Sequence, residues 1–379
     1  MNKNHIRIFV ITLITFFMSA ILIACDNKEE ESPFNMNNLA KVWDGNTIYN
    51  ETVVLVDDGT EISGKLLFEP TEVISVKDYT LEKSYDQTEY EVKGNKIVRT
   101  ANSKMPYFTT EQLAGKNLPD GYGLSTYQAK EVGTEIVFTE GIGIVMHQIA
   151  VTYKHNGKWA GITPAHQPQY LENTLAKLQN KEEVTIVVNG DSISTGANSS
   201  GVLGIKPFQD DFPTILQNYL QNKYQATVNL INTSVGGTTS AQGKTGVDAN
   251  VNAYNPDLVI IGYGMNDGTF RVSPQEYKNN IEFMIKSIQA RNPNADILVI
   301  ATMVANPISI QNQIQKDYLD PILDLQETYG VAVLDMTSIS ETLFETKRGV
   351  DVLANNINHP SDFLVRIYAQ GLVTVITGD

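Results

Sequence analysis

The chain has 379 residues, of which 42% are hydrophobic and 19% charged, a composition that is ordinary for a globular protein with two or three domains. Its formal net charge is −15, from 43 acidic and 28 basic residues, and no basic run offsets it. An acidic surface repels phosphate backbones, so the composition argues against a nucleic-acid partner.

The first 25 residues have the pattern of an export signal. Lys3 and Arg7 precede an uncharged, mostly apolar stretch over residues 8–24. This pattern is typical of a secretory signal, and its length leaves a transmembrane anchor as the alternative. The Leu-Ile-Ala sequence directly before Cys25 resembles the bacterial lipoprotein box, in which the cysteine is lipidated. The resemblance implies residues 1–25 as the signal and an extracytoplasmic protein that is lipid-anchored to a bacterial membrane or cell surface.

A flexible tether and a β-rich domain are predicted next. Residues 26–38 are polar and acidic, which is typical of a tether. From 39 to 168, short β-branched and aromatic runs alternate with turn residues. The Asn-Gly pair at 156–157 predicts a hairpin with residues 158–159 on the return strand. Many short strands separated by turns predict a β-sandwich-like domain over residues 39–168.

From residue 169 to the C-terminus at 379, apolar strands alternate with amphipathic helices. The predicted strands cover residues 184–188, 228–231, 258–261, 297–302 and 331–334. Parallel strands need long crossover connections, so this alternation predicts a mostly parallel sheet with helices on both faces. In such sheets, ligands bind at the carboxyl ends of the strands.

The first of these strands ends in Gly-Asp-Ser, with the serine at position 192. Ser192 at that edge can present both its hydroxyl and its own backbone N–H to a crevice. Those are the groups that an acyl-transfer nucleophile needs. Taken alone, the motif is weak evidence and is better explained as a local turn in which the polar side chains satisfy backbone donors.

Three downstream loops carry the other polar groups. Gly236 and Gly237 follow the second strand, Asn266 lies in a Gly-Met-Asn-Asp sequence after the third, and Asn356 and His359 precede the last helix. Each loop by itself is also typical of a turn or of a helix start.

The four segments, in this order, resemble the SGNH hydrolase superfamily, also called GDSL hydrolases. The four blocks of that superfamily supply a serine, a glycine, an asparagine and a histidine. The resemblance covers residues 184–379 and does not include the β-rich domain. It implies a flavodoxin-like, three-layer α/β/α domain over residues 169–379 with serine esterase activity.

The resemblance implies a role for each matched residue. Ser192 is the expected nucleophile, forming an acyl-enzyme, and His359 is its expected base. The backbone N–H groups of Ser192 and Gly237 and the side-chain amide of Asn266 are expected to form the oxyanion hole. Gly236 is the alternative to Gly237. No cofactor is expected, and no cluster of acidic and histidine residues has metal-ligand spacing.

One position departs from the family pattern. The family has aspartate three residues before the histidine, where this sequence has Asn356. In serine proteases, exchanging the triad aspartate for asparagine lowers turnover by about ten-thousandfold. We expect an oxygen of residue 356, from its backbone or its side chain, to orient His359. Asp362 and Asp351 are the alternatives, although Asp362 suits the first turn of the last helix better.

The order of the predicted domains is similar to that of carbohydrate esterase family two, some members of which use a dyad supported by a carbonyl. This resemblance implies an esterase that removes small acyl groups, acetyl in the first place, from a carbohydrate. One alternative is a lipase, thioesterase or arylesterase acting on other acyl esters. Another is a glycan-binding lipoprotein whose hydrolase site has decayed at Asn356.

Overall fold

The computed structural model describes residues 39 and 41–379. The predicted signal over residues 1–25, with Cys25, and the tether over residues 26–38 lie outside the described residues. Within the described part of the chain, no helix is both long and apolar enough to cross a membrane.

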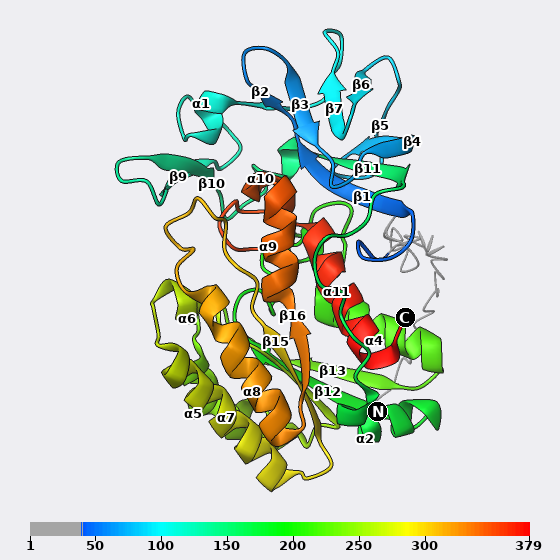
Figure 1. The fold of residues 1–379 in the computed structure, drawn as a ribbon, viewed down its shortest axis with the longest axis vertical. Coiled ribbons are helices and arrows are strands. Elements are labelled where there is room, and N and C mark those ends of the chain that lie inside the picture. The colour runs from blue at the N-terminus through cyan, green and yellow to red at the C-terminus, as the bar shows by residue number, and fades with distance from the viewer. Residues whose placement is uncertain (1–38, 40) are drawn as a thin grey trace, which may run out of the picture. The chain divides into compact units, whose positions relative to one another are not determined.

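The N-terminal part of the described chain is β-rich (Figure 1). One antiparallel sheet has the order β1 (Thr47–Val54), β11 (Gln148–His155), β4 (Pro70–Asp78) and β5 (Ser84–Tyr85). A second sheet has the order β6 (Tyr90–Lys93), β7 (Lys96–Arg99), β3 (Ile62–Lys65), β2 (Val56–Asp57) and β8 (Phe108–Thr109), which leads into α1 (Thr110–Leu113). A separate hairpin pairs β9 (Ser125–Gln128) with β10 (Glu135–Phe138). These mainly antiparallel sheets fit the predicted β domain.

The predicted hairpin at residues 156–157 is wrong. β11 ends at His155, and residues 156–160 continue without regular structure. The neighbours of β11 are β1 and β4, both of which precede it in the chain. Because both edges of β11 are already paired, no edge is left for a return strand. Gly157 instead packs against Phe68, where a Cβ atom would lie 2.6 Å from the ring.

The rest of the chain forms the predicted α/β layer structure. Its sheet has the order β13 (Val228–Asn232), β12 (Val184–Gly190), β14 (Leu258–Gly262), β15 (Asp296–Ala301) and β16 (Ala332–Asp335). All neighbouring pairs in this sheet are parallel. The structure therefore confirms an α/β fold with a parallel sheet.

Helices cover both faces of this sheet (Figure 1). One layer contains α2 (Glu172–Gln179), α4 (Phe212–Tyr224), α9 (Met336–Thr346) and α11 (Asp362–Thr377), and the other contains α5 (Ser240–Asn250), α7 (Pro274–Arg291) and α8 (Leu319–Tyr329). Alternate strand residues face opposite layers: Ile186 and Val188 pack with the first, whereas Val187 packs with the second. Strands buried on both faces must be apolar throughout, which explains their continuous hydrophobic runs.

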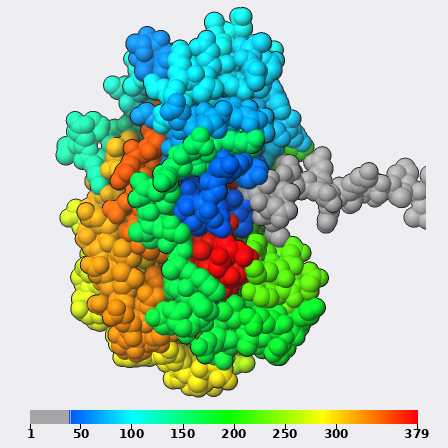
Figure 2. Space-filling model, turned by 45° about the vertical axis from the view of Figure 1, so that its right-hand side comes forward, coloured from blue at the N-terminus to red at the C-terminus, as the bar shows by residue number. Residues whose placement is uncertain are grey.

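The β-rich and α/β parts share one apolar core. A single cluster of buried residues runs from Val53 and Ile149 in the β-rich part to Leu334 and Leu372 in the α/β part. In the space-filling view, only a small part of the C-terminal helix (red) is visible on this face, between the first strands (blue) and green segments of the α/β part (Figure 2). The β-rich part is therefore packed directly onto the layer that carries α11.

Candidate active site

The nucleophile candidate lies at the carboxyl end of β12. Ser192 comes two residues after the strand ends and is 7% exposed. The ends of β12 and β14 approach closely at Gly190, where a Cβ atom would lie 2.4 Å from the carbonyl oxygen of Gly262. The backbone N–H of Asp191 donates to that same carbonyl oxygen over 3.2 Å. The glycine therefore allows the contact between strands that sets the position of Ser192.

The structure brings His359 to Ser192, although 167 residues separate them. The distance from His359 Nε2 to Ser192 Oγ is 3.0 Å. The loop that carries the histidine follows α10 (Gly349–Val352) and precedes α11. Asn355 holds this loop, because its Oδ1 accepts the backbone N–H groups of Ile357, Asn358 and His359 over 2.9 to 3.0 Å. The serine and the imidazole are thus placed as a nucleophile and its base need to be.

The structure corrects the expectation for residue 356. Both of its oxygens accept from Asn306 Nδ2, the backbone carbonyl over 2.7 Å and the side-chain Oδ1 over 2.9 Å. Its own Nδ2 donates to the carbonyl of Val137 in β10 over 2.8 Å. Asn356 has a left-handed backbone, with φ +64°. Its contacts are with Asn306 and β10, and they tie the His359 loop to the β-rich part.

The two alternative carboxylates are also engaged elsewhere. Asp362 accepts from the backbone N–H and the hydroxyl of Ser200. Asp351 accepts from the backbone N–H groups of Val54 and Arg348. Neither contact involves the imidazole of His359.

Two residues that the sequence reasoning missed face His359 Nδ1. Asn198 Oδ1 lies 2.5 Å from this nitrogen, and Glu140 Oε2 lies 3.4 Å from it. Asn198 belongs to the polar loop between Ser192 and α3 (Ser200–Leu203), so proximity to the nucleophile in the chain was an available signal. Glu140 comes from the β-rich part, two residues after β10, and nothing in its local sequence points to the site.

The oxyanion-hole candidates surround the serine. A Cβ atom on Gly236 would lie 3.7 Å from the Cβ of Ser192, whereas one on Gly237, which has φ +77°, would meet open space. Asn266, in α6 (Met265–Thr269), donates from Nδ2 to the carbonyl of Thr238 over 2.9 Å, which leaves its second amide hydrogen. Within residues 39 and 41–379, no acceptor takes the backbone N–H of Ser192 or of Gly237. These donors are therefore available to a bound oxyanion.

Burial divides the carboxyl groups near the site into two kinds. Burial raises the pKa of Asp191 to about 7, although its Oδ1 accepts the N–H of Ile193. Burial likewise raises the pKa of Asp267, which accepts from Ser240. By contrast, the hydrogen bond with His359 lowers the pKa of Glu140, whose side chain is 60% exposed. The carboxylate on the exposed side of His359 is thus the one that stays ionised most readily.

Among the residues that the structure describes, no group of three or more His, Cys, Asp or Glu side chains is placed to hold a metal ion. The donor set at the site consists of a hydroxyl, an imidazole, amides and one exposed carboxylate. These are the functional groups that nucleophilic acyl transfer uses.

Comparisons with known proteins concern the α/β part. Residues 188–363, a little under half of the chain, match the model of the GDSL-like Lipase/Acylhydrolase family. The thioesterase 1/protease 1/lysophospholipase L1 of Escherichia coli strain K12 is 27% identical over 108 residues, which are 28% of this chain and 47% of that protein. An arylesterase of Vibrio mimicus is 30% identical over 115 residues, 30% of this chain and 54% of that protein. The chain thus spans about half the length of these curated relatives.

Solved structures also resemble the chain. A two-domain esterase active on acetylated mannans has 19% identity and a TM-score of 0.46, over 56% of this chain and 53% of that one. A catalytic mutant of Axe2, an acetylxylan esterase from Geobacillus stearothermophilus, has 16% identity and a TM-score of 0.42, over 50% of this chain and 92% of that one. The matched segment 188–363 contains the candidate nucleophile, its base and the oxyanion donors. The α/β part of this chain therefore contains the segment that is similar to the GDSL-like Lipase/Acylhydrolase family.

Proposed function

We propose that this protein is a serine esterase that removes small acyl groups, acetyl in the first place, from a carbohydrate. The observation that carries the proposal is the 3.0 Å contact between Ser192 Oγ and His359 Nε2. This pair lies at the carboxyl edge of a parallel sheet, where such folds bind their ligands.

The geometry supports a two-step reaction. His359 Nε2 accepts the hydroxyl proton as Ser192 Oγ attacks the acyl carbon, and the carbonyl oxygen becomes negatively charged. The N–H groups of Ser192 and Gly237 and the free amide hydrogen of Asn266 are the donors proposed to hold that oxygen. His359 then protonates the leaving alcohol. In the second step, His359 takes a proton from water, which attacks the acyl-enzyme, and the acid leaves as Ser192 regains its proton.

The proposal of a carbohydrate substrate with a short acyl group is supported by other observations than the proposed reaction. The β-rich part precedes the hydrolase part, as in carbohydrate esterase family two, which the sequence resembles. Around the reacting pair, Glu140 is exposed, and Thr238 and Asn266 are half-buried. Polar side chains of this kind can hydrogen-bond the hydroxyls of a sugar, which an alkyl chain does not offer.

Hydrolysis of p-nitrophenyl acetate by the mature protein tests the proposed reaction. The matched control is Ser192→Ala, which removes one buried hydroxyl and keeps the rest of the site. We expect the variant to fall to the background rate, because no nucleophile remains. Equal rates for the two proteins would refute catalysis at Ser192.

A second candidate function is hydrolysis of other acyl esters, which the names of the curated relatives, a thioesterase/lysophospholipase and an arylesterase, favour. Comparing acetyl with octanoyl p-nitrophenyl esters separates the two, because the main proposal expects the acetyl ester to have the higher kcat/KM. A panel of acetylated oligosaccharides then tests the carbohydrate.

We also propose lipidation at Cys25, on the strength of the Leu-Ile-Ala sequence before it. The lipid would keep the protein on a membrane outside the cytoplasm. In an export-competent bacterium, we expect radiolabelled palmitate to be incorporated into the wild type and not into Cys25→Ser. Equal labelling of both proteins would contradict the assignment.

A further inference from the structure

We propose that Glu140, from the β-rich part, is the positioning residue that replaces the missing triad aspartate, and that it acts on His359 in two ways. Its backbone carbonyl sets the tautomer of the imidazole, and its carboxylate stabilises the imidazolium. The inference rests on the proposed function of Ser192 and His359. Glu140 lies outside the family-matched segment 188–363.

The backbone carbonyl acts through Asn198. Asn198 Nδ2 donates to the carbonyl oxygen of Glu140 over 2.8 Å. The carbonyl of Glu140 can only accept a hydrogen bond, so it must face the amide nitrogen of Asn198. Asn198 Oδ1 therefore points toward His359 Nδ1. An amide oxygen also only accepts, and Nδ1 must therefore carry a proton. The lone pair of the neutral ring is then on Nε2, facing Ser192 Oγ, which is the tautomer that a general base needs.

The carboxylate supplies what Asn198 lacks. An amide oxygen orients the ring but carries no net charge, whereas a triad acid also stabilises the imidazolium that forms during attack. Glu140 Oε2, 3.4 Å from Nδ1, is close enough for a charge interaction. The hydrogen bond to His359 lowers the pKa of Glu140, in keeping with a carboxylate that is ionised when the ring becomes charged.

Other charged groups on the elements around His359 are engaged elsewhere. Asp362 at the start of α11 bonds Ser200, and Asp191 before the nucleophile bonds the N–H of Ile193. Arg366 on α11 donates to the backbone carbonyls of Tyr49 and Asn50. Glu140 is the carboxylate that lies against Nδ1.

The segment that carries Glu140 is held on both sides. Before it, the Val137 carbonyl in β10 accepts from Asn356 Nδ2 over 2.8 Å. Next to it, Thr139 Oγ1 donates to the carbonyl of Gly123 and accepts from the N–H of Gly141, both over 2.9 Å. Asn356, at the position of the family aspartate, thus ties the His359 loop to the strand that leads to the substitute carboxylate.

The test compares Glu140→Gln, Glu140→Asp and the matched control Glu135→Gln in the full chain. Glu135 is an exposed residue of the same hairpin and has no contact with His359. The backbone carbonyl of residue 140 is present in every variant, so the comparison isolates the carboxylate. The readouts are kcat/KM for p-nitrophenyl acetate against pH at low ionic strength, and the NMR resonance of the proton on His359 Nδ1.

We expect Glu140→Gln to lower kcat/KM by roughly three- to tenfold, a modest loss because the side chain is largely exposed and screened. The loss should shrink toward acid pH, where the wild-type carboxylate takes up a proton and no longer differs in charge from glutamine, and the NMR resonance of the proton on His359 Nδ1 should move in Glu140→Gln. Glu140→Asp, which keeps the charge, should retain most of the activity, and Glu135→Gln should match the wild type.

Two results would overturn the assignment: a Glu140→Gln protein with the wild-type rate, pH profile and Nδ1 proton resonance, or equal losses in Glu140→Asp and Glu140→Gln. A wild-type rate no higher than that of Ser192→Ala would refute the proposed function instead. The NMR resonance of the Nδ1 proton still decides the role of Glu140 in that case, because it needs no turnover.

Discussion

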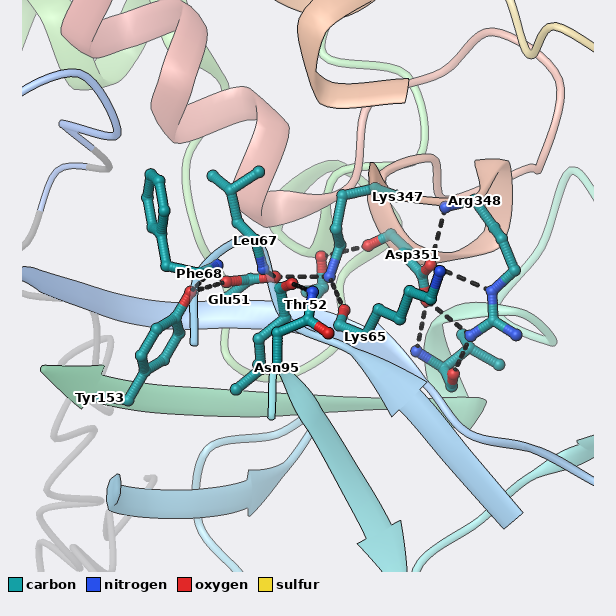
Figure 3. A network of polar contacts seen from close by, with 12 residues as sticks. Glu51, Thr52, Lys65, Leu67, Phe68, Asn95, Tyr153, Lys347, Arg348 and Asp351 are labelled. Carbon is teal, nitrogen blue, oxygen red and sulfur yellow. Dashed lines mark hydrogen bonds and ion pairs between the residues drawn. The ribbon is translucent and has the colours of Figure 1, made fainter. Parts of the chain in front are cut away.

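Replacing Lys347 by methionine tests how the β-rich part is joined to the segment that leads to His359. Lys347 follows α9, and its ammonium group contacts Glu51 Oε1 in β1 over 2.5 Å (Figure 3). Both side chains are completely buried. The ammonium group also donates to the carbonyl oxygen of Lys65 over 2.6 Å. Methionine keeps the length and apolar volume of the side chain while removing the charge and both contacts.

The expected loss of unfolding free energy depends on the hydrogen bonds that Glu51 keeps in the Lys347→Met variant. Breaking a buried ion pair by removing one partner costs about 3–5 kcal/mol, because the other charge stays buried without compensation. In this variant, the Glu51 carboxylate would still accept from the N–H of Leu67 over 2.9 Å and from the hydroxyl of Tyr153 over 2.6 Å. These two remaining donors compensate part of the buried charge. We therefore expect a loss at the lower end of that range, about 3 kcal/mol of the free energy of unfolding.

The assay is urea unfolding at pH 7, followed by the fluorescence of Trp43 and Trp159. The control is Lys154→Met, because Lys154 pairs with Glu72 where both side chains are about half exposed. Exposed pairs contribute about 1 kcal/mol or less, so this variant should stay close to the wild type.

The double variant Glu51→Gln/Lys347→Met should recover part of the loss. Its neutral amide no longer leaves a charge buried, and its single oxygen can still accept from one of the two remaining donors. A Lys347→Met protein within about 0.5 kcal/mol of the wild type would refute the reasoning.

Three further predictions follow from single contacts. Asn356→Asp restores the family residue but removes the donor to the Val137 carbonyl, so we expect lower esterase activity and a lower melting temperature; a gain in kcat/KM would contradict the geometry. Gly190→Ala places a Cβ atom 2.4 Å from the Gly262 carbonyl, and thermal unfolding should show a loss of about 2 kcal/mol or more. For Asp191, the folded pKa of about 7 exceeds the unfolded value, so the group favours the folded state less as pH rises from about 4 to 7. Asp191→Asn should therefore gain about 1–3 kcal/mol relative to the wild type between pH 5 and pH 8, and a pH-independent difference in urea unfolding would speak against it.

The sheet could be anticipated because its signal is local, whereas the pairing of Ser192 with His359 was expected from the resemblance to the SGNH superfamily. The continuous apolar run at 184–188 predicts a strand buried on both faces, and the structure places β12 there. The polar loops after the parallel strands must meet at one edge, which brings Ser192 near Gly237 and Asn266. Local signals were insufficient for the hairpin at 156–157, because the partners of β11 come from β1 and β4, far back in the chain.

The sequence by itself determined a parallel sheet with polar loops at one edge, because strand periodicity and turn residues act within a few positions. The resemblance to the SGNH superfamily then pointed to the serine, the histidine and the candidate oxyanion donors in those loops. Only the tertiary structure decided which groups contact Nδ1 of the histidine. The oxygens of Asn356, three positions before His359, accept hydrogen bonds from Asn306. His359 Nδ1 instead contacts Asn198, 161 residues earlier, and Glu140 of the β-rich part. Packing brings these groups together across the fold, and no pattern of neighbouring residues encodes that contact.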